Sequence, residues 1–106
     1  MADVIIVNED NFQSEVVESS LPVLLDFWAP WCGYCTKLAP VLDELAIEMT
    51  TMKIAKINVD ENRSIAQKYN VMTLPTMLLF ENGQQVEKFT GFMPKTTIIN
   101  KVTPLL

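Results

Sequence analysis

The longest apolar run of the chain, residues 21–28, is interrupted only by Pro22 and Asp26. Its hydrophobic positions are continuous rather than alternating, which predicts a strand covered on both faces, as in a parallel sheet. Residues 4–7 form a shorter run of β-branched side chains, and residues 52–59 largely alternate between apolar and polar side chains. Both patterns predict further strands.

Four segments carry apolar residues at helical spacing. The first follows Asn8 or Asn11, either of which could cap a helix, and the third follows Asn62 and ends at a left-handed Asn70. The last is expected to have Pro94 at its first position, where a backbone N–H is not needed. The four apolar stripes are Phe12, Val16 and Val17; Leu38, Leu42, Leu45 and Met49; Ile65, Ala66 and Tyr69; and Ile98, Ile99 and Val102.

Residues 76–80 are apolar and predict another strand. The dipeptide Asn82-Gly83 predicts a tight hairpin that joins this strand to residues 85–90, with Gly91 at the end. The elements therefore alternate as strand–helix–strand–helix–strand, followed by a short helix, two strands and a helix. Parallel strands joined by helices require right-handed crossovers, so we expect one α/β domain over residues 1–106 with a mixed sheet.

Composition and charge narrow the possible partners. The chain has 106 residues, 49% of them hydrophobic, and a formal net charge of −5. An acidic protein lacks the clustered Lys and Arg that nucleic acids and anionic membranes require, so we expect neither as a partner. The opening residues, Met1 to Val4, show no basic segment before a long apolar run, and no run is long enough for a membrane span. We therefore expect a cytoplasmic protein.

The only two cysteines, Cys32 and Cys35, are the candidate chemistry of this sequence, which has no histidine. In a reducing compartment we do not expect two cysteines to form a structural disulfide. Structural zinc takes four Cys or His ligands, so we expect no metal, although a site completed by carboxylates or bridging a dimer stays open. The missing histidine excludes hydrolases of the Cys–His type.

The segment around the cysteines is similar to the active-site segment of the thioredoxin family. The resemblance extends over nearly the whole chain, through Asp26, residues 28–35, Pro40, Lys56, Asp60, residues 74–76, Asn82-Gly83 and Gly91. It implies the thioredoxin fold, a five-stranded mixed sheet of order 1-3-2-4-5 flanked by four helices. It also implies a monomeric protein-disulfide reductase without a bound cofactor, recharged by thioredoxin reductase and acting on disulfide-containing proteins.

The position of Cys32 at the start of a helix favours its thiolate, because backbone N–H groups and the helix dipole stabilise a negative charge there. Cys35 lies three residues later on nearly the same helix face. We expect the Cys32 thiolate to attack a substrate disulfide, and Cys35 then to release the reduced substrate by forming the Cys32–Cys35 bond. The alternative is a pair of inert buried thiols.

Asp26 lies within an apolar strand and is placed to take the proton of Cys35. Burial should raise the pKa of its carboxyl toward a useful range. The family resemblance implies that Lys56 lies nearby and moderates this charge. The alternatives are an Asp26 side chain that reaches solvent at a strand end and a Lys56 side chain on a solvated face.

Tyr34 departs from the family pattern, in which proline usually occupies this position between Gly33 and Cys35. Tyrosine adds a backbone N–H in the first turn of the helix, which we expect to lie close to the Cys32 sulfur. An added charge-assisted hydrogen bond would make the pair more oxidising by some tens of millivolts, about 30 mV for each 1.4 kcal/mol. The alternative is an exposed aromatic side chain without effect.

The resemblance also marks a docking surface for substrates. It implies a cis peptide bond before Pro75, which with Gly33 and Tyr34 would tune the site. The backbone of Leu74 would then be free to pair with an extended substrate segment. The other expected docking residues are Trp31, Thr90, Gly91 and Phe92, each of which could instead serve ordinary packing. We expect the methionines to fill the core, namely Met49, Met52, Met72, Met77 and Met93.

Two further functions fit the same sequence. Tyr34 would suit a thiol oxidant or disulfide isomerase with a raised reduction potential, although an export signal and a dimerisation domain are not visible. A binding subunit could use the surface around Trp31, Leu74 and Gly91 without any redox turnover. A double serine variant of Cys32 and Cys35 would keep its function only in this last case.

Overall fold

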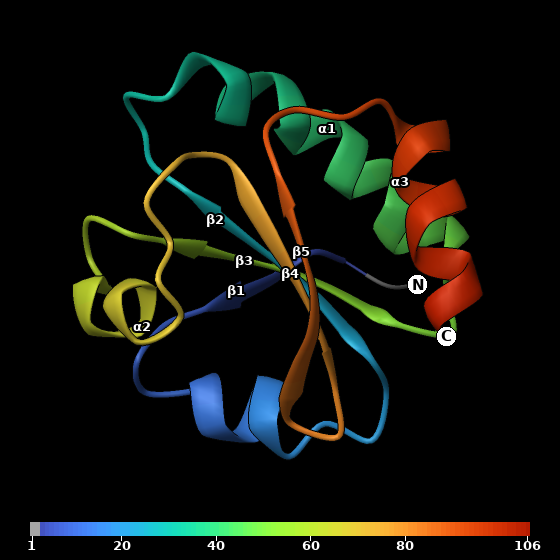
Figure 1. Ribbon diagram of the computed structural model, residues 1–106, viewed down its shortest axis with the longest axis horizontal. Helices are drawn as coiled ribbons and strands as arrows, with labels where there is room; N and C mark the ends of the chain where they lie inside the picture. Colours follow the sequence, from blue (N-terminus) through green and yellow to red (C-terminus); the bar gives the residue numbers. More distant parts are fainter. Residues whose placement is uncertain (1–2) are drawn as a thin grey trace.

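The fold of the chain is seen in a computed structural model that describes residues 3–106 (Figure 1). The first two positions of the opening segment, on which the expected lack of a leader partly rests, lie outside the described residues. Five strands form one mixed sheet with the order β1-β3-β2-β4-β5, which confirms the expected topology. The strands are β1 (Ile5–Val7), β2 (Val23–Trp28), β3 (Lys53–Asn58), β4 (Thr76–Glu81) and β5 (Gln84–Thr90).

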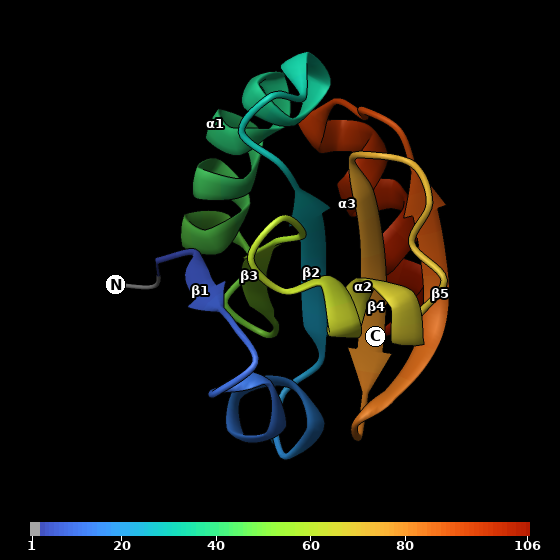
Figure 2. The same cartoon turned by 90° about the vertical axis from the view of Figure 1, so that its left-hand side faces the viewer.

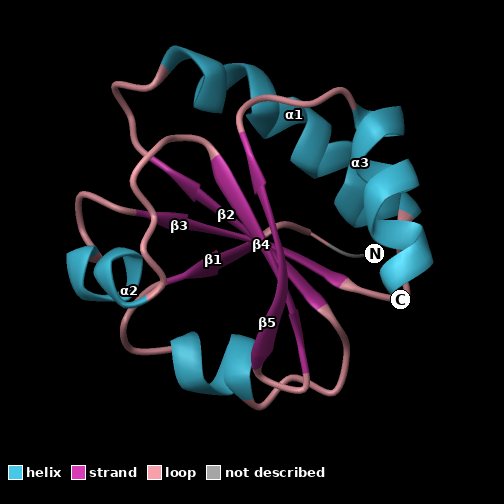
Figure 3. Ribbon diagram, viewed as in Figure 1, coloured by secondary structure: helices cyan, strands magenta, loops and turns pink. Residues whose placement is uncertain are grey.

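The expected four helices cover both faces of the sheet (Figure 3). They are η1 (Gln13–Val17), α1 (Gly33–Glu48), α2 (Arg63–Lys68) and α3 (Lys95–Val102), and a 3₁₀ turn, η2 (Thr103–Leu105), follows the last one. One core cluster joins the sheet to α1 and α3, and a second joins the opposite face to η1 and α2. Among residues 3–106, no helix has the length and apolar character to cross a bilayer.

Strand β2 lies at the centre of the sheet, parallel to β3 and antiparallel to β4. Residues 23–27 are all buried, as the continuous apolar run predicts for a strand covered on both faces. The strand begins at Val23 rather than at Leu21. Leu21 is 41% exposed, and the Pro22 carbonyl accepts a hydrogen bond from the Lys53 backbone N–H at 2.8 Å.

The first helix has an unexpected form. It is a π-helix, in which the backbone N–H of Glu18 donates to the Gln13 carbonyl at 2.9 Å, five residues earlier. The expected stripe is nevertheless on its inner side, because Phe12 and Val16 are buried in the core cluster that lies under η1 and α2. The apolar spacing identified the buried face but not the hydrogen-bond pattern.

The helices begin and end near the predicted residues, but the predicted capping interactions are not all present. Asn62 directly precedes α2, but its side chain does not cap the helix. Its Nδ2 donates to the Asn58 carbonyl at 3.0 Å, and its Oδ1 accepts from the Glu9 backbone N–H at 2.9 Å. Asn70 has a φ of 55°, which confirms the left-handed end, whereas Pro94 lies one residue before α3 rather than inside it.

The hairpin between β4 and β5 turns at Asn82 and Gly83, as predicted, with φ values of 53° and 79°. Gly83 is also required for space, because a Cβ built there would lie 2.6 Å from the Val17 carbonyl oxygen. The register of the hairpin shifts between Leu79 and Phe80. The turn therefore packs directly against the end of η1.

Candidate active site

The two cysteines lie where the chain leaves β2 and enters α1. Cys32 is the N-cap of the helix, and its Sγ accepts a hydrogen bond from the Cys35 backbone N–H at 3.2 Å. The Cys32 backbone N–H donates to the Ala29 carbonyl at 3.1 Å and so closes the turn that precedes the helix. The two residues form a disulfide with their Cα atoms 5.3 Å apart. Cys32 is 8% exposed and Cys35 4%, so both residues are buried and Cys32 is slightly the more exposed of the two.

In the disulfide form, a backbone N–H of helix α1 donates to the Cys32 sulfur, and the effect of the Tyr34 N–H on the thiolate stays a prediction. The donor is the backbone N–H of Cys35, not that of Tyr34. Among the described residues, the Tyr34 N–H donates no backbone hydrogen bond, as is usual in the first turn of a helix. The Tyr34 side chain points outward, is 61% exposed, and lies under the Lys37 Nζ, which is 5.3 Å from the ring centroid.

Asp26 is a buried carboxyl on β2 that the core does not satisfy. Asp26 is only 2% exposed, and within residues 3–106 its Oδ1 has no hydrogen-bond partner. Burial raises its pKa from 3.8 to about 7, because the charged form loses its hydration, while the positive charge of Lys56 acts in the opposite direction. The carboxyl is therefore poised to exchange a proton near neutral pH.

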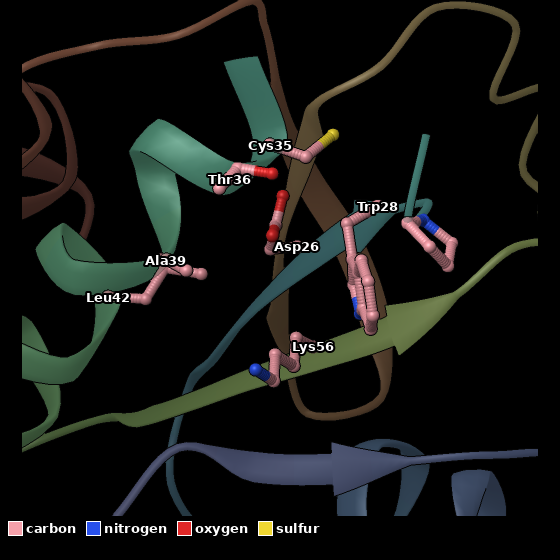
Figure 4. Close-up of a pocket in the computed structure, with 8 residues that line it drawn as sticks. Asp26, Trp28, Cys35, Thr36, Ala39, Leu42 and Lys56 are labelled. Carbon is pink, nitrogen blue, oxygen red and sulfur yellow. The ribbon is translucent and has the colours of Figure 1, made fainter. Parts of the chain in front are cut away.

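A cavity of about 160 Å³ connects this carboxyl with the disulfide (Figure 4). Asp26 on β2 and Cys35 on α1 both line it, and the view shows the Asp26 carboxyl directed toward the start of α1. The other lining residues are Trp28, Pro30, Thr36, Ala39, Leu42 and Lys56. Cys35 and the buried Asp26 thus line one small space beneath the start of α1.

Lys56 is half-buried on β3, directly across from Asp26 in the parallel register. Its Nζ lies 5.5 Å from the centre of the Trp28 ring, so the ammonium faces an aromatic surface as well as the carboxyl. The family resemblance predicted that Lys56 lies near Asp26. Sequence periodicity alone left open whether the side chain faces solvent.

The Leu74–Pro75 peptide bond is cis, as expected. Pro75 is buried, and its carbonyl accepts a hydrogen bond from the Gly91 backbone N–H at 2.8 Å. This bond brings the start of β4 and the end of β5 together, so two of the expected docking segments are neighbours. Gly91 has a φ of 88°, a left-handed conformation that glycine adopts readily.

The remaining docking candidates lie at the surface to different degrees. Trp31 is 71% exposed and Phe92 38%, Thr90 is exposed, and Leu74 is half-buried against the core. The indole Nε1–H of Trp31 donates to Asp60 Oδ2 at 3.0 Å, which orients the exposed ring. Asp60 was not among the predicted site residues, although an exposed tryptophan commonly places its N–H on an acceptor.

Met72 corrects the expectation that the methionines fill the core. It is 91% exposed, whereas Met52 and Met77 are buried as predicted. Met49 and Met93 pack partly buried against the cluster beneath α1 and α3. Met72 lies in the loop that leads to Pro75, and its apolar type gave no sign of that location.

Comparisons with known proteins agree with this geometry. The family model described as Thioredoxin matches residues 3–104. Thioredoxin from Haemophilus influenzae is 50% identical, with 94% of each chain covered, and Thioredoxin 1 from Synechococcus elongatus is 48% identical, with 89% of each covered. The chloroplastic M-type thioredoxin of Spinacia oleracea is 44% identical over 94% of this chain and 56% of that protein.

The match extends over almost all of the chain and includes the residues that form the site. The paired cysteines form a disulfide at a helix start, which is the arrangement required for reversible exchange with other disulfides. The protein is thus a thiol–disulfide oxidoreductase with the activity of a disulfide reductase, and its chain belongs to the thioredoxin family.

Proposed function

We propose that this oxidoreductase serves as a general reductase of protein disulfides, with Cys32 as the attacking sulfur, Cys35 as the resolving sulfur and Asp26 as the proton acceptor. One observation supports this assignment most directly. Within residues 3–106, Oδ1 of the buried Asp26 has no hydrogen-bond partner, and Asp26 shares a small cavity with Cys35, the more deeply buried of the two cysteines.

The first step joins the protein to its substrate. With the pair reduced, the Cys32 thiolate attacks one sulfur of a substrate disulfide and forms a mixed disulfide, while the other substrate sulfur leaves as a thiolate. The helix N-terminus and the backbone N–H of Cys35 stabilise the attacking thiolate. Cys32 is suited to this role because it is the slightly more exposed residue of the pair.

The second step releases the substrate. Cys35 gives its proton to Asp26, and the resulting thiolate attacks the Cys32 sulfur, so the Cys32–Cys35 bond forms and the second substrate thiol departs. A carboxyl with a pKa of about 7 is near the optimum for accepting and later returning a proton at neutral pH. Lys56 keeps the pKa from rising further, because its charge favours the carboxylate.

Substrate segments bind, in this proposal, across the surface formed by Trp31, Leu74, Thr90, Gly91 and Phe92. Its support is the exposure of Trp31 and the hydrogen bond that holds the Pro75 and Gly91 segments together. An extended peptide could pair with the backbone of Leu74 and so place its disulfide against Cys32.

The electrons come from a partner enzyme, which we propose to be thioredoxin reductase, and the chain needs no bound cofactor because the two sulfurs carry the electron pair. We propose a monomer in the cytoplasm, since a dithiol reductant works where thiols are kept reduced. The relatives include chloroplastic proteins, so fractionation of the native host is the test of location.

Insulin reduction with NADPH and thioredoxin reductase tests the proposal. We expect the wild type to precipitate insulin chains, Cys32→Ser to be inactive, and Cys35→Ser to accumulate a mixed disulfide through Cys32 that mass spectrometry detects. The assignment fails if Cys35→Ser turns over at the rate of the wild type, or if the mixed disulfide forms on Cys35 in Cys32→Ser.

A further inference from the structure

The loop between α2 and β4, residues 69–75, carries part of the proposed docking surface. Helix α2 has only six residues, and the chain beyond it continues as a loop that runs beside β5 to the start of β4 (Figure 2). Met72 in this loop is 91% exposed, and Leu74 is half-buried against the core. An irregular segment in this position needs ties to other elements to keep one conformation.

Hydrogen bonds hold the loop at several points. At its end, the Thr76 Oγ1 donates to the Thr73 carbonyl at 2.6 Å, and the Gly91 backbone N–H donates to the Pro75 carbonyl at 2.8 Å. At its start, the Val71 backbone N–H donates to the Ala66 carbonyl at 2.9 Å. One further hydrogen bond to the loop comes from a side chain of β5, and its acceptor is the backbone carbonyl of Asn70.

Lys88 of β5 provides that tie. Its Nζ donates to the backbone carbonyl of Asn70 at 3.0 Å, where the chain turns out of α2 with a left-handed φ of 55°. Lys88 is the register partner of Leu78 on β4, so both side chains lie on the face of the sheet that α2 covers. Leu78 is buried there in the cluster against which Leu74 packs.

Among residues 3–106, no carboxylate forms an ion pair with the ammonium of Lys88. Within the described chain, the lysines in ion pairs are Lys53 and Lys95, and Lys88 is not among them. The adjacent Glu87 uses its Oε1 to accept the backbone N–H of Lys88 instead. The side chain is half-buried, so its stem is partly fixed along the sheet edge before the hydrogen bond forms.

We propose that Lys88 is a positioning residue for the binding of protein substrates, because it fixes the docking loop from the edge strand of the sheet. This inference rests on the proposed function, since it assumes that Leu74 pairs with an extended substrate segment. Without the lysine donor the loop samples more conformations, and binding must then restrict them. A small disulfide that makes no contact with the loop should be unaffected.

The test compares Lys88→Met, which keeps an apolar stem without the donor, with Lys88→Arg, which restores a donor. Lys101→Met is the matched control, because Lys101 lies on α3 at the opposite face of the sheet. The reduced proteins react with increasing concentrations of insulin, and separately with the small disulfide 5,5′-dithiobis(2-nitrobenzoate). Amide exchange of residues 72–74 and the reduction potential are measured alongside.

For Lys88→Met we expect the half-saturating insulin concentration to rise about three- to tenfold, the range of one hydrogen bond. The limiting rate, the reduction potential and the rate with the small disulfide stay unchanged. Amide exchange at Thr73 and Leu74 becomes faster, and Lys88→Arg recovers most of the effect. Lys101→Met behaves as the wild type.

The proposal is wrong if Lys88→Met leaves both the insulin dependence and the amide exchange of the loop unchanged. It is also wrong if the rate with the small disulfide falls as much as that with insulin, since the lysine would then act on the cysteines themselves. Neither result affects the proposed function, which is tested separately by insulin reduction with the wild-type protein and with the two cysteine variants.

Discussion

Asp26 and Lys56 lie directly opposite each other on the parallel strands β2 and β3, and both line the cavity that reaches Cys35. Partners in a sheet register direct their side chains to the same face, so the register alone places the ammonium beside the carboxyl. Burial nevertheless outweighs this attraction, because the net effect on Asp26 is a raised pKa. The site thus keeps a carboxyl that is neutral in part at physiological pH.

The pKa of Asp26 predicts how stability depends on pH. Its value is 3.8 in the ordinary state and about 7 in the fold, so the folded state binds the proton more tightly. The protonated Asp26 contributes fully to the free energy of unfolding below about pH 4. This contribution, at most about 4 kcal/mol, is lost as the pH rises to about 7. Urea unfolding of the oxidised protein from pH 4 to 8 should show this decline. Asp26→Asn should flatten it, and an equally steep decline in that variant would contradict the explanation.

We expect Asp26→Asn to slow only one step of the reaction, the resolution of the mixed disulfide by Cys35. Without the carboxylate, Cys35 loses its proton less readily, so the mixed disulfide should resolve about 10- to 100-fold more slowly at pH 7, the lower range for general bases. Its formation through Cys32 should keep its rate. Quenched-flow trapping with a peptide disulfide separates the two steps. Equal slowing of both would remove Asp26 from the proton transfer.

We expect Tyr34→Pro to lower the reduction potential of the Cys32–Cys35 pair. In the disulfide state the sulfur of Cys32 accepts a hydrogen bond from the Cys35 N–H, and within residues 3–106 the Tyr34 N–H at the helix N-terminus donates no backbone hydrogen bond. In the dithiol state it can also stabilise the Cys32 thiolate, and proline removes it. The potential measured against glutathione should fall by some tens of millivolts, about 30 mV for each 1.4 kcal/mol. A Tyr34→Ala variant keeps the N–H and should stay near the wild type, and a drop of equal size there would point to the ring instead.

Gly83→Ala predicts a loss of stability at the hairpin. The left-handed φ of 79° is unfavourable for alanine, and its Cβ would lie 2.6 Å from the Val17 carbonyl oxygen. The expected loss is about 2–4 kcal/mol by urea unfolding. Gly91→Ala is the matched control, since its φ is 88° but nothing lies within 4 Å of the added Cβ. Equal losses in the two variants would show that conformation alone matters.

Local patterns predicted much of the fold. The continuous apolar run identified β2 as a central strand, and Asn82-Gly83 identified the hairpin, because burial on two faces and a left-handed turn each leave a signature in a few adjacent residues. The cysteine pair was visible for the same reason. The π-helical form of η1 was not predicted, since its apolar spacing also fits an ordinary helix.

The contacts that depend on the path of a loop or on the register of distant strands were not predicted. Met72 has the composition of a core residue, but the loop that carries it directs it outward. The tie between Lys88 and Asn70 joins residues 18 positions apart, and nothing in either neighbourhood specifies it. The hydrogen bond from the Cys35 N–H to the Cys32 sulfur was not predicted, because it depends on how the first turn of α1 is wound.

The atom that begins helix α1 is also the atom that exchanges electrons, because the N-cap of that helix is the Cys32 sulfur. Serine is among the best natural N-caps, so Cys32→Ser should keep the helix start while abolishing the chemistry. We therefore expect this variant to be redox-inactive but still able to bind protein targets through the docking surface. Its use as a competitor would measure recognition separately from reduction.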